Sequence, residues 1–378
     1  MVLPANSLGN RVECLADDGG AVRRTYLGGS RRPDLLNLAP VDVRTIKSTQ
    51  KHTGGTPVSL STNLKASYFW YDIHLMKHSY ILTLFAITLI GHAMQAADAP
   101  TKTEPLPTFA DVAYGPAERQ TLDFYQAPGN SPRPLLVIIN GGGWIHSEKT
   151  LGGYARFIPH GISVACIRYR LTPDDPLPAP VLDAARAVQY LRSKAVEWNI
   201  DPQRVIACGD SAGGCSALWL ATHDDLATPA AVDPVERQTT RLTGAAVLNA
   251  QTTIEPASIR AWIGERGVQH GMIRSAGGFK TNEEMDQAIA NRPKVADLYH
   301  EFSPVNHLSA DDPPIFFDYG TPLENTTEGI HHSLFGLKFL EKAESLGIKT
   351  CYLGIRKDDR YPGYPGGMDT FINRLLQP

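Results

Sequence analysis

Neither sign of charge dominates this sequence. Lysine and arginine together number 36, aspartate and glutamate together number 39, and the formal net charge is −3. Proteins that bind nucleic acid or an anionic membrane surface carry a basic excess, often gathered in one stretch. We therefore predict no nucleic-acid partner and no electrostatic attachment to lipid.

Cysteine is scarce, and its spacing matches no metal site. Only five cysteines occur among 378 residues, and none belongs to the closely spaced pairs that are typical of zinc sites. Cys166, Cys208 and Cys351 fall in predicted inner strands, and Cys215 in a predicted helix, which is typical of buried free thiols. No phosphate-binding loop occurs either. The sequence predicts neither a metal nor a cofactor.

The chain also lacks an apolar run long enough to cross a membrane, for which about 20 residues are needed. The longest candidate, 80–90, is soon followed by His92. With Lys77 before it and small residues up to Ala97 after it, this stretch is typical of a secretory signal peptide. We predict export to the periplasm or the medium, with Met76 as the start and cleavage near Ala97.

Three segments follow from this assignment. Residues 1–75 show neither helical nor strand periodicity, and we interpret them as a disordered extension or as a stretch absent from the protein. Residues 76–97 form the predicted signal peptide. Residues 98–378, about 280 in number, are enough for one domain with a sizeable core.

Apolar runs of strand length alternate with helical periodicity in this domain. Strands are predicted at 122–124, 135–139, from 163, at 205–208, 244–248, 314–319 and 350–355, and helices at 181–192, 212–222, 333–345 and 369–376. This alternation predicts an α/β fold, with a mostly parallel sheet covered by helices on both faces. Residues 251–300 do not follow the alternation, and we expect a cap over the functional site or a surface excursion.

Gly209, Ser211 and Gly213 stand where a predicted strand meets a predicted helix. Only small residues fit beside so sharp a turn, and the turn pushes the serine Oγ out at the top of the sheet. This arrangement is the nucleophile elbow of serine hydrolases. We therefore predict that Ser211 is a nucleophile with a strained backbone, and that Ala212 donates its N–H to an oxyanion.

A second glycine-rich turn, 140–144, follows the apolar run 135–139 and reads Asn-Gly-Gly-Gly-Trp. Successive glycines let the backbone approach a substrate closely and aim its N–H groups at a developing negative charge. We predict that Gly142 and Gly143 donate to the oxyanion, and that Asn140 and Trp144 complete this substrate-binding loop.

The two motifs resemble those of the esterase and lipase branch of the α/β-hydrolase fold, close to bacterial carboxylesterases of the feruloyl- and acetyl-esterase type. Residues 140–144 resemble the family's His-Gly-Gly-Gly-Trp, and 209–214 its Gly-x-Ser-Ala-Gly-Gly. Residues 169–171 resemble its Tyr-Arg-Leu, and 199–202 its turn into the elbow strand. The resemblance extends from about residue 111 to about residue 376. It implies an α/β-hydrolase fold and hydrolysis of carboxylic esters by a serine.

The resemblance also implies a carboxylate after the strand that ends at Gly320 and a histidine after the strand that ends near Ile355. The chain departs from the family pattern at both of these places. After Gly320 it reads Thr-Pro-Leu-Glu, so Glu324 is the nearest carboxylate, and no histidine follows Ile355. An exposed aspartate from that last loop, Asp358 or Asp359, removes a serine proton poorly because its pKa lies well below neutrality.

His331 and His332 are the nearest remaining histidines. If the protein is an esterase, one of them must reach Ser211, with Glu324 or Glu328 as the orienting carboxylate. His307 precedes a strand, so we expect it at the opposite edge of the sheet in a structural role. His146 lies shortly past the glycine loop, within reach of a substrate, and we expect a solvated loop position for it.

Two functions fit these observations. One is an exported serine carboxylesterase that hydrolyses esters with short acyl groups, including carbohydrate-linked esters. The other is a catalytically degenerate protein of the same fold that binds an ester or a carbohydrate. The elbow and the oxyanion loop favour the first function, and the missing histidine favours the second. The sequence leaves the acyl group, the alcohol and the oligomeric state open.

Overall fold

The computed structural model describes residues 104–325, 327 and 329–377. The predicted signal peptide and the stretch before it lie outside this range. None of the described helices combines the length and the apolar character that a membrane span requires.

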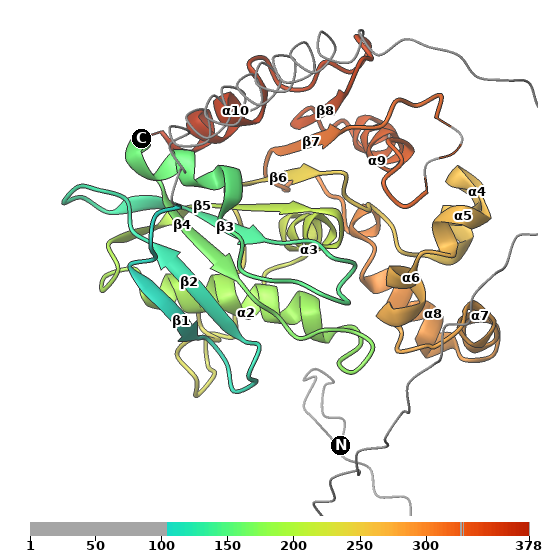
Figure 1. Ribbon diagram of the computed structural model, residues 1–378, viewed down its shortest axis with the longest axis horizontal. Coiled ribbons are helices and arrows are strands. Elements are labelled where there is room, and N and C mark those ends of the chain that lie inside the picture. The colour runs from blue at the N-terminus through green and yellow to red at the C-terminus, as the bar shows by residue number, and fades with distance from the viewer. Residues whose placement is uncertain (1–103, 326, 328, 378) are drawn as a thin grey trace, which may run out of the picture. The chain divides into compact units, whose positions relative to one another are not determined.

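One eight-stranded sheet organises the described residues (Figure 1), in the order β1-β2-β4-β3-β5-β6-β7-β8. β1 and β2 pair antiparallel, as do β2 and β4, and every later pair is parallel. The strands are β1 (Phe109–Ala113), β2 (Thr121–Tyr125), β3 (Arg133–Ile139), β4 (Ser163–Ile167), β5 (Ile200–Asp210), β6 (Gly244–Leu248), β7 (Ile315–Tyr319) and β8 (Cys351–Ile355).

Apolar side chains project from both faces of the sheet, because successive residues of a strand point to opposite sides. In β3, Leu135, Val137 and Ile139 belong to the larger of two buried clusters, and Leu136 and Ile138 belong to the smaller one. A continuous apolar run therefore buries both sides of the strand, as the sequence predicted.

Helices cover each face (Figure 1). On the side of the larger cluster lie α2, α3 and α9, and on the other side lie η1 and α10. Their bounds are η1 (Gly152–His160), α2 (Ala179–Ser193), α3 (Ser211–Thr222), α9 (Leu334–Ser345) and α10 (Gly367–Leu376). The predicted α/β-hydrolase fold is confirmed.

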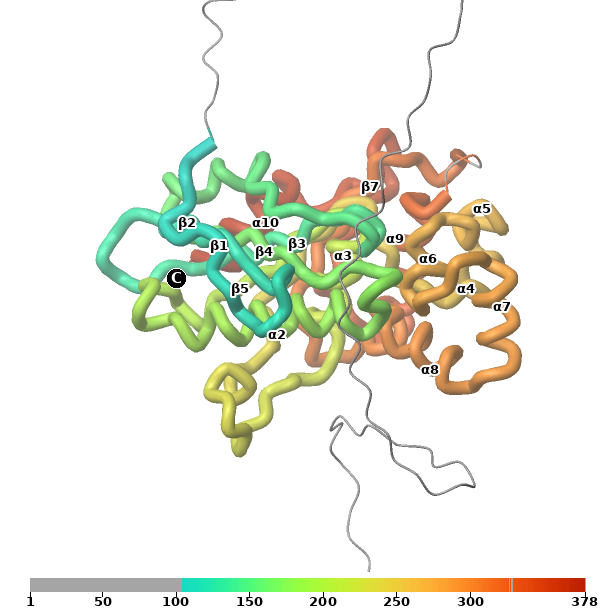
Figure 2. The backbone as a smooth tube through the Cα atoms, turned by 60° about the horizontal axis from the view of Figure 1, so that its bottom comes forward, coloured from blue at the N-terminus to red at the C-terminus, as the bar shows by residue number. Residues whose placement is uncertain are grey.

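The residues between β6 and β7 form five helices and a short 3₁₀ turn. They are α4 (Pro256–Ile263), α5 (Glu265–Val268), α6 (Gly271–Ala276), α7 (Asn282–Asn291), α8 (Pro293–Glu301) and η2 (Pro304–Asn306). Both views show α4 to α8 gathered on one side of the sheet (Figures 1 and 2). Ile259, Met272 and Tyr299 are buried in the same cluster as α2 and α3, so this insertion shares the main core.

β1 pairs outside β2 and forms an edge of the sheet. Two details differ from the sequence predictions. Residues 199–202 are not a turn before β5: the strand already begins at Ile200, and its register with β3 shifts before Val205. Cys351 begins the edge strand β8 and is half-buried, whereas Cys166 and Cys208 are fully buried in inner strands.

Candidate active site

The elbow is built where β5 runs directly into α3. β5 ends at Asp210, α3 begins at Ser211, and Ser211 has a φ of +48°. A non-glycine residue in this region is strained by about 1–3 kcal/mol. A Cβ on Gly209 would lie 2.5 Å from the carbonyl of Gly213, and one on Gly213 would overlap the carbonyl of Ile139. Only glycine therefore lets α3 pack this closely against β5 and β3.

The glycine loop that follows β3 is fixed at both ends. The N–H of Gly141 donates to Oδ1 of Asp210 at 2.9 Å, which joins the loop to the elbow. The indole Nε1 of Trp144 donates to Oγ of Ser216 at 3.0 Å, inside the core. Between these anchors, Gly142 and Gly143 have φ values of +106° and +66°, a region that glycine adopts without strain.

The backbone donors of this loop are available to a ligand. Within the described ranges, no hydrogen bond uses the N–H of Gly142, Gly143 or Ala212. Gly142 and Gly143 line the same cavity as Ser211. These are the three donors that the sequence predicted for an oxyanion.

Of the two adjacent histidines, the structure brings His331 to the serine. Nε2 of His331 lies 2.8 Å from Oγ of Ser211. His332 is buried, and its Nδ1 accepts the N–H of Leu334 at 3.0 Å, at the start of α9. The turn before α9 thus directs one imidazole to the serine and uses the other to hold the end of the helix.

Glu324 does not orient His331, contrary to the prediction. Its side chain is 72% exposed, and Oε1 lies 3.0 Å from Nη2 of Arg360. Glu328 lies outside the described residues. In the part of the chain that the structure describes, no carboxylate is hydrogen-bonded to His331.

A cavity of about 450 Å³ opens at Ser211. Its walls come from the glycine loop, the elbow, the insertion and the turn before α9. The lining residues are Gly142, Gly143, Ile145, His146, Asp210, Ser211, Asn249, His270, Gly271 and His331. Through His270 and Gly271, the insertion forms one wall of the site.

Sequence reasoning missed several of the lining residues, among them Asn249 and His270. Asn249 follows β6 with a φ of +47°, and its Oδ1 accepts the N–H of Gly320 at 2.9 Å. Its place at the carboxyl end of a parallel strand, where such folds bind ligands, was an available signal. His270 caps the start of α6 (Gly271–Ala276), and its ring centroid lies 6.4 Å from that of His331. Burial, followed by the neighbouring His331, lowers the pKa of His270, and no local pattern marked this residue.

Two residues of the predicted substrate loop have other roles. Trp144 is fully buried and does not line the cavity, so its indole holds the loop rather than contacting a ligand. Asn140 donates from Nδ2 to the carbonyl of Thr150 at 3.3 Å, and it too lies outside the cavity. Both side chains hold the loop in place, Trp144 through Ser216 and Asn140 through Thr150, and neither lines the cavity at Ser211.

A larger cavity, of about 880 Å³, lies elsewhere and is lined by Arg133, His160 and Arg204 among others. These residues stand near the amino ends of β3, β4 and β5. Parallel α/β sheets bind ligands at the carboxyl ends of their strands. Ser211 stands at the carboxyl end of β5, so it lies at the opposite edge of the sheet from this larger cavity.

The sequence profile of the BD-FAE family matches residues 122–322, more than half of the chain. The chain belongs to the BD-FAE family. The BD-FAE match includes the glycine loop and Ser211 but ends before His331.

Curated relatives of this BD-FAE protein are esterases. One is isoprenylcysteine alpha-carbonyl methylesterase ICME of Arabidopsis thaliana, 25% identical over 58% of this chain and 56% of the relative. Another is the probable carboxylic ester hydrolase LipM of Mycobacterium tuberculosis, 26% identical over 56% of this chain and 47% of the relative. The chain thus spans about half the length of these relatives.

Solved structures share the fold. A truncated carbohydrate esterase from gut microbiota aligns with a TM-score of 0.56 and 17% identity, over 74% of this BD-FAE chain and 99% of that one. The acetyl ester-xyloside bifunctional hydrolase of Caldicellulosiruptor lactoaceticus aligns with a TM-score of 0.50 and 23% identity, over 62% and 76%.

Proposed function

We propose that this protein is a serine carboxylesterase in which Ser211 is the nucleophile and His331 the general base. The observation that carries the proposal is the 2.8 Å contact between Nε2 of His331 and Oγ of Ser211. A serine hydroxyl is a weak nucleophile unless a base within hydrogen-bond reach takes its proton. The esterase relatives support the same reaction class.

The first half of the reaction forms an acyl-enzyme. Oγ of Ser211 attacks the ester carbonyl carbon while its proton moves to Nε2 of His331. The carbonyl oxygen becomes an oxyanion, which the N–H groups of Gly142, Gly143 and Ala212 stabilise, because they have no other partner among the described residues. The tetrahedral intermediate then collapses, and the imidazolium returns the proton to the departing alcohol oxygen.

The second half releases the acid. Water enters the position left by the alcohol, gives a proton to Nε2 of His331 and attacks the acyl carbon. The same donors stabilise the second oxyanion. When this intermediate collapses, Oγ of Ser211 leaves with the proton from His331, and the carboxylic acid departs.

Short acyl groups are the proposed substrates, and the alcohol is proposed to be carbohydrate-like. The cavity of about 450 Å³ suits a small ester rather than a long acyl chain. Asp210, Asn249 and His270 offer polar atoms along its wall, as a hydroxyl-rich alcohol requires. A comparison of kcat/KM for an acetylated sugar and for 4-nitrophenyl acetate tests this preference, and equal values for the two esters would contradict it.

Binding without turnover is the alternative function. It is favoured by the departures of the sequence from the family pattern, because no histidine follows Ile355 and Glu324 pairs with Arg360 instead of a histidine. Changing the orienting aspartate of a well-studied triad lowers kcat by about 10⁴-fold. The two functions therefore predict very different rates with the same ester.

Hydrolysis of 4-nitrophenyl acetate by matched variants separates these functions. We expect Ser211→Ala and His331→Asn each to lower kcat by about 10⁴-fold or more. His332→Asn is the matched control, because an asparagine Oδ1 accepts the N–H of Leu334 in place of Nδ1, and we expect near-parental activity. An inactive parent protein supports the binding function, and a fully active His331→Asn variant shows that another base is used.

We also infer export through the signal peptide that begins at Met76. The basic start and the apolar run 80–90 support this assignment. Amino-terminal sequencing of the native protein is expected to give a start near Asp98, and a start at Met1 or Val2 would refute it.

A further inference from the structure

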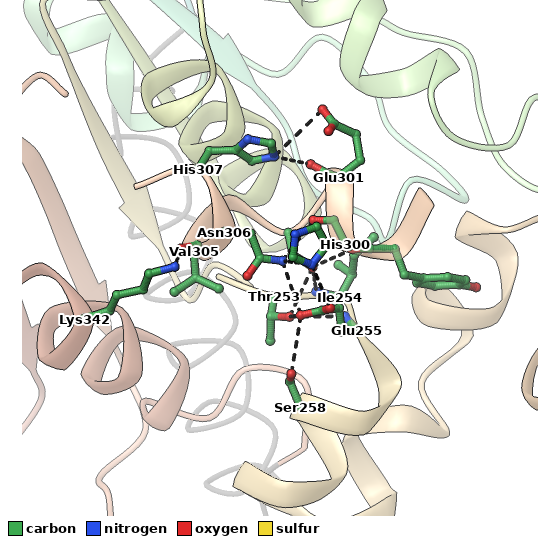
Figure 3. Close-up of polar contacts among 12 residues, drawn as sticks. Thr253, Ile254, Glu255, Ser258, His300, Glu301, Val305, Asn306, His307 and Lys342 are labelled. Carbon is green, nitrogen blue, oxygen red and sulfur yellow. Dashed lines mark hydrogen bonds and ion pairs between the residues drawn. The ribbon is translucent and has the colours of Figure 1, made fainter. Parts of the chain in front are cut away.

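The carboxyl-terminal ends of two helices meet at a cluster of three side chains of types that bind metal ions in proteins. His223 directly follows α3, Glu301 ends α8, and His307 follows η2. One ligand atom from each lies within 4.8 Å of the other two, and no other such group of three occurs in the described ranges. Glu301 and His307 are drawn side by side in Figure 3.

The distances suit a small divalent ion. Oε1 of Glu301 lies 3.1 Å from Nε2 of His223 and 3.8 Å from Nε2 of His307. Zinc ligands at about 2.0–2.1 Å in tetrahedral geometry are separated by roughly 3.3 Å. An ion placed among the three atoms therefore needs only small side-chain adjustments.

The His223 ring is oriented as a metal-binding imidazole is. Its Nδ1 lies 2.9 Å from the backbone oxygen of Asp224 and donates to it, so Nε2 is the ring atom left for a metal. The ring also stacks on Trp219, with centroids 4.1 Å apart. Nε2 faces Oε1 of Glu301 at 3.1 Å, so both atoms are placed to bind a cation that lies between them.

His307 can give up its present hydrogen bond at low cost. Its Nε2 donates to the backbone oxygen of Glu301, as the dashed line in Figure 3 shows. The same oxygen accepts the indole N–H of Trp219 at 2.8 Å. When a metal takes Nε2 and the ring proton moves to Nδ1, this carbonyl still keeps the indole of Trp219 as a donor.

The local field favours a cation. Each helix carries a partial negative charge at its carboxyl-terminal end, and the ends of α3 and α8 converge here together with the Glu301 carboxylate. Arg241 donates to the backbone oxygen of His223 at 3.4 Å, but its charge is balanced by Asp311 at 2.8 Å. The two imidazoles are about one-fifth exposed, which leaves an entry path and room for water ligands.

The geometry points to a divalent transition-metal site, suited to Zn²⁺, formed by His223, Glu301 and His307. The site is structural rather than catalytic. His223 lies twelve residues after Ser211, roughly 18 Å along the helix. A bound ion joins the end of the elbow helix to the end of the insertion whose residues His270 and Gly271 line the cavity.

Titration of the chelator-treated, full-length protein with Zn²⁺ tests this site. We expect one saturable equivalent and a thermal midpoint that rises by about 5 °C or more at a 100-fold excess over Kd. The electronic spectrum of the Co²⁺-loaded protein is expected to show nitrogen and oxygen ligands, and a thiolate-to-cobalt band would overturn the assignment.

Variants assign the ligands. His223→Ala, His307→Ala and Glu301→Gln are each expected to weaken Zn²⁺ binding by about 100-fold or more. Glu301→Gln keeps the side-chain shape and the backbone carbonyl, so it tests the site even if the histidine variants fold poorly.

His300→Ala is the matched control, because that exposed histidine precedes Glu301 but contacts Glu255 instead. We expect its Zn²⁺ affinity to equal that of the parent protein. Absence of saturable Zn²⁺ binding, or unchanged binding in Glu301→Gln, would overturn the proposal.

Discussion

Replacing Gly142 by alanine tests the oxyanion loop directly. Gly142 has a φ of +106°, and an added Cβ would overlap the backbone oxygen of His146. That oxygen belongs to backbone rather than to a flexible side chain, so the clash is relieved only when the loop itself moves. The N–H groups of Gly142 and Gly143 move with it.

The magnitude follows from the geometry. Relief of the clash requires a shift of roughly 1 Å, and a displacement of that size costs about 10²-fold in rate. Loss of one oxyanion donor costs about 10²–10³-fold in kcat. We therefore expect kcat for 4-nitrophenyl acetate to fall by about 10²–10³-fold. KM should change little, because the oxyanion forms only in the transition state.

Gly347→Ala is the matched control for backbone strain. Gly347 has a similar positive φ of +76°, but a Cβ there meets nothing within 4 Å. We expect both variants to lose about 1–2 kcal/mol of unfolding free energy from the strained backbone, and only Gly142→Ala to lose activity. A Gly142→Ala variant with parental kcat would refute the assignment of this loop as an oxyanion hole.

Three further predictions concern stability and reactivity. Trp144→Phe removes the donor to Ser216, so urea titrations should show an unfolding free energy lower by about 1 kcal/mol. The variant should also have a lower kcat, and a parental kcat would contradict the loop-holding role of Trp144. Burial raises the pKa of Asp312 to about 6, so the folded state binds an extra proton and stability falls as pH rises from 4 to 6. The unfolding free energy of Asp312→Asn, taken relative to that of the parent, should therefore rise by about 1–2 kcal/mol from pH 4 to pH 7. A difference between the two proteins that does not change with pH would disprove this. Burial also raises the pKa of Cys166 to about 12, so iodoacetamide at pH 8 should label Cys166 and the buried Cys208 only after unfolding, as mass spectrometry would detect.

The elbow and the glycine loop were predictable because the constraint on each is local. At the elbow, strand and helix join without a connecting residue, and the neighbours of Ser211 must be small whatever the rest of the chain does. The apolar run of β3 likewise shows in sequence that both of its faces are buried.

The sequence limited the candidates for the general base to His331 and His332 but did not distinguish between them. His331 and Ser211 are 120 positions apart, and nothing local records their 2.8 Å contact. His331 and His332 are adjacent and chemically identical, so only the turn into α9 decides which of them meets Oγ. The prediction that Glu324 orients the histidine was wrong for the same reason. Glu324 is the nearest carboxylate in sequence, but in the structure it pairs with Arg360.

By itself, the sequence determined the α/β fold, the strained serine and the glycine loop beside it, because steric rules and side-chain periodicity act between near neighbours. Tertiary structure alone decided which histidine lies at Ser211, that Asn249 and His270 line the cavity, and that His223, Glu301 and His307 form one cluster. These side chains come together because parallel strands bring distant loops to one edge and because the insertion packs on α3. Such contacts depend on how whole elements pack, which no short stretch of sequence encodes.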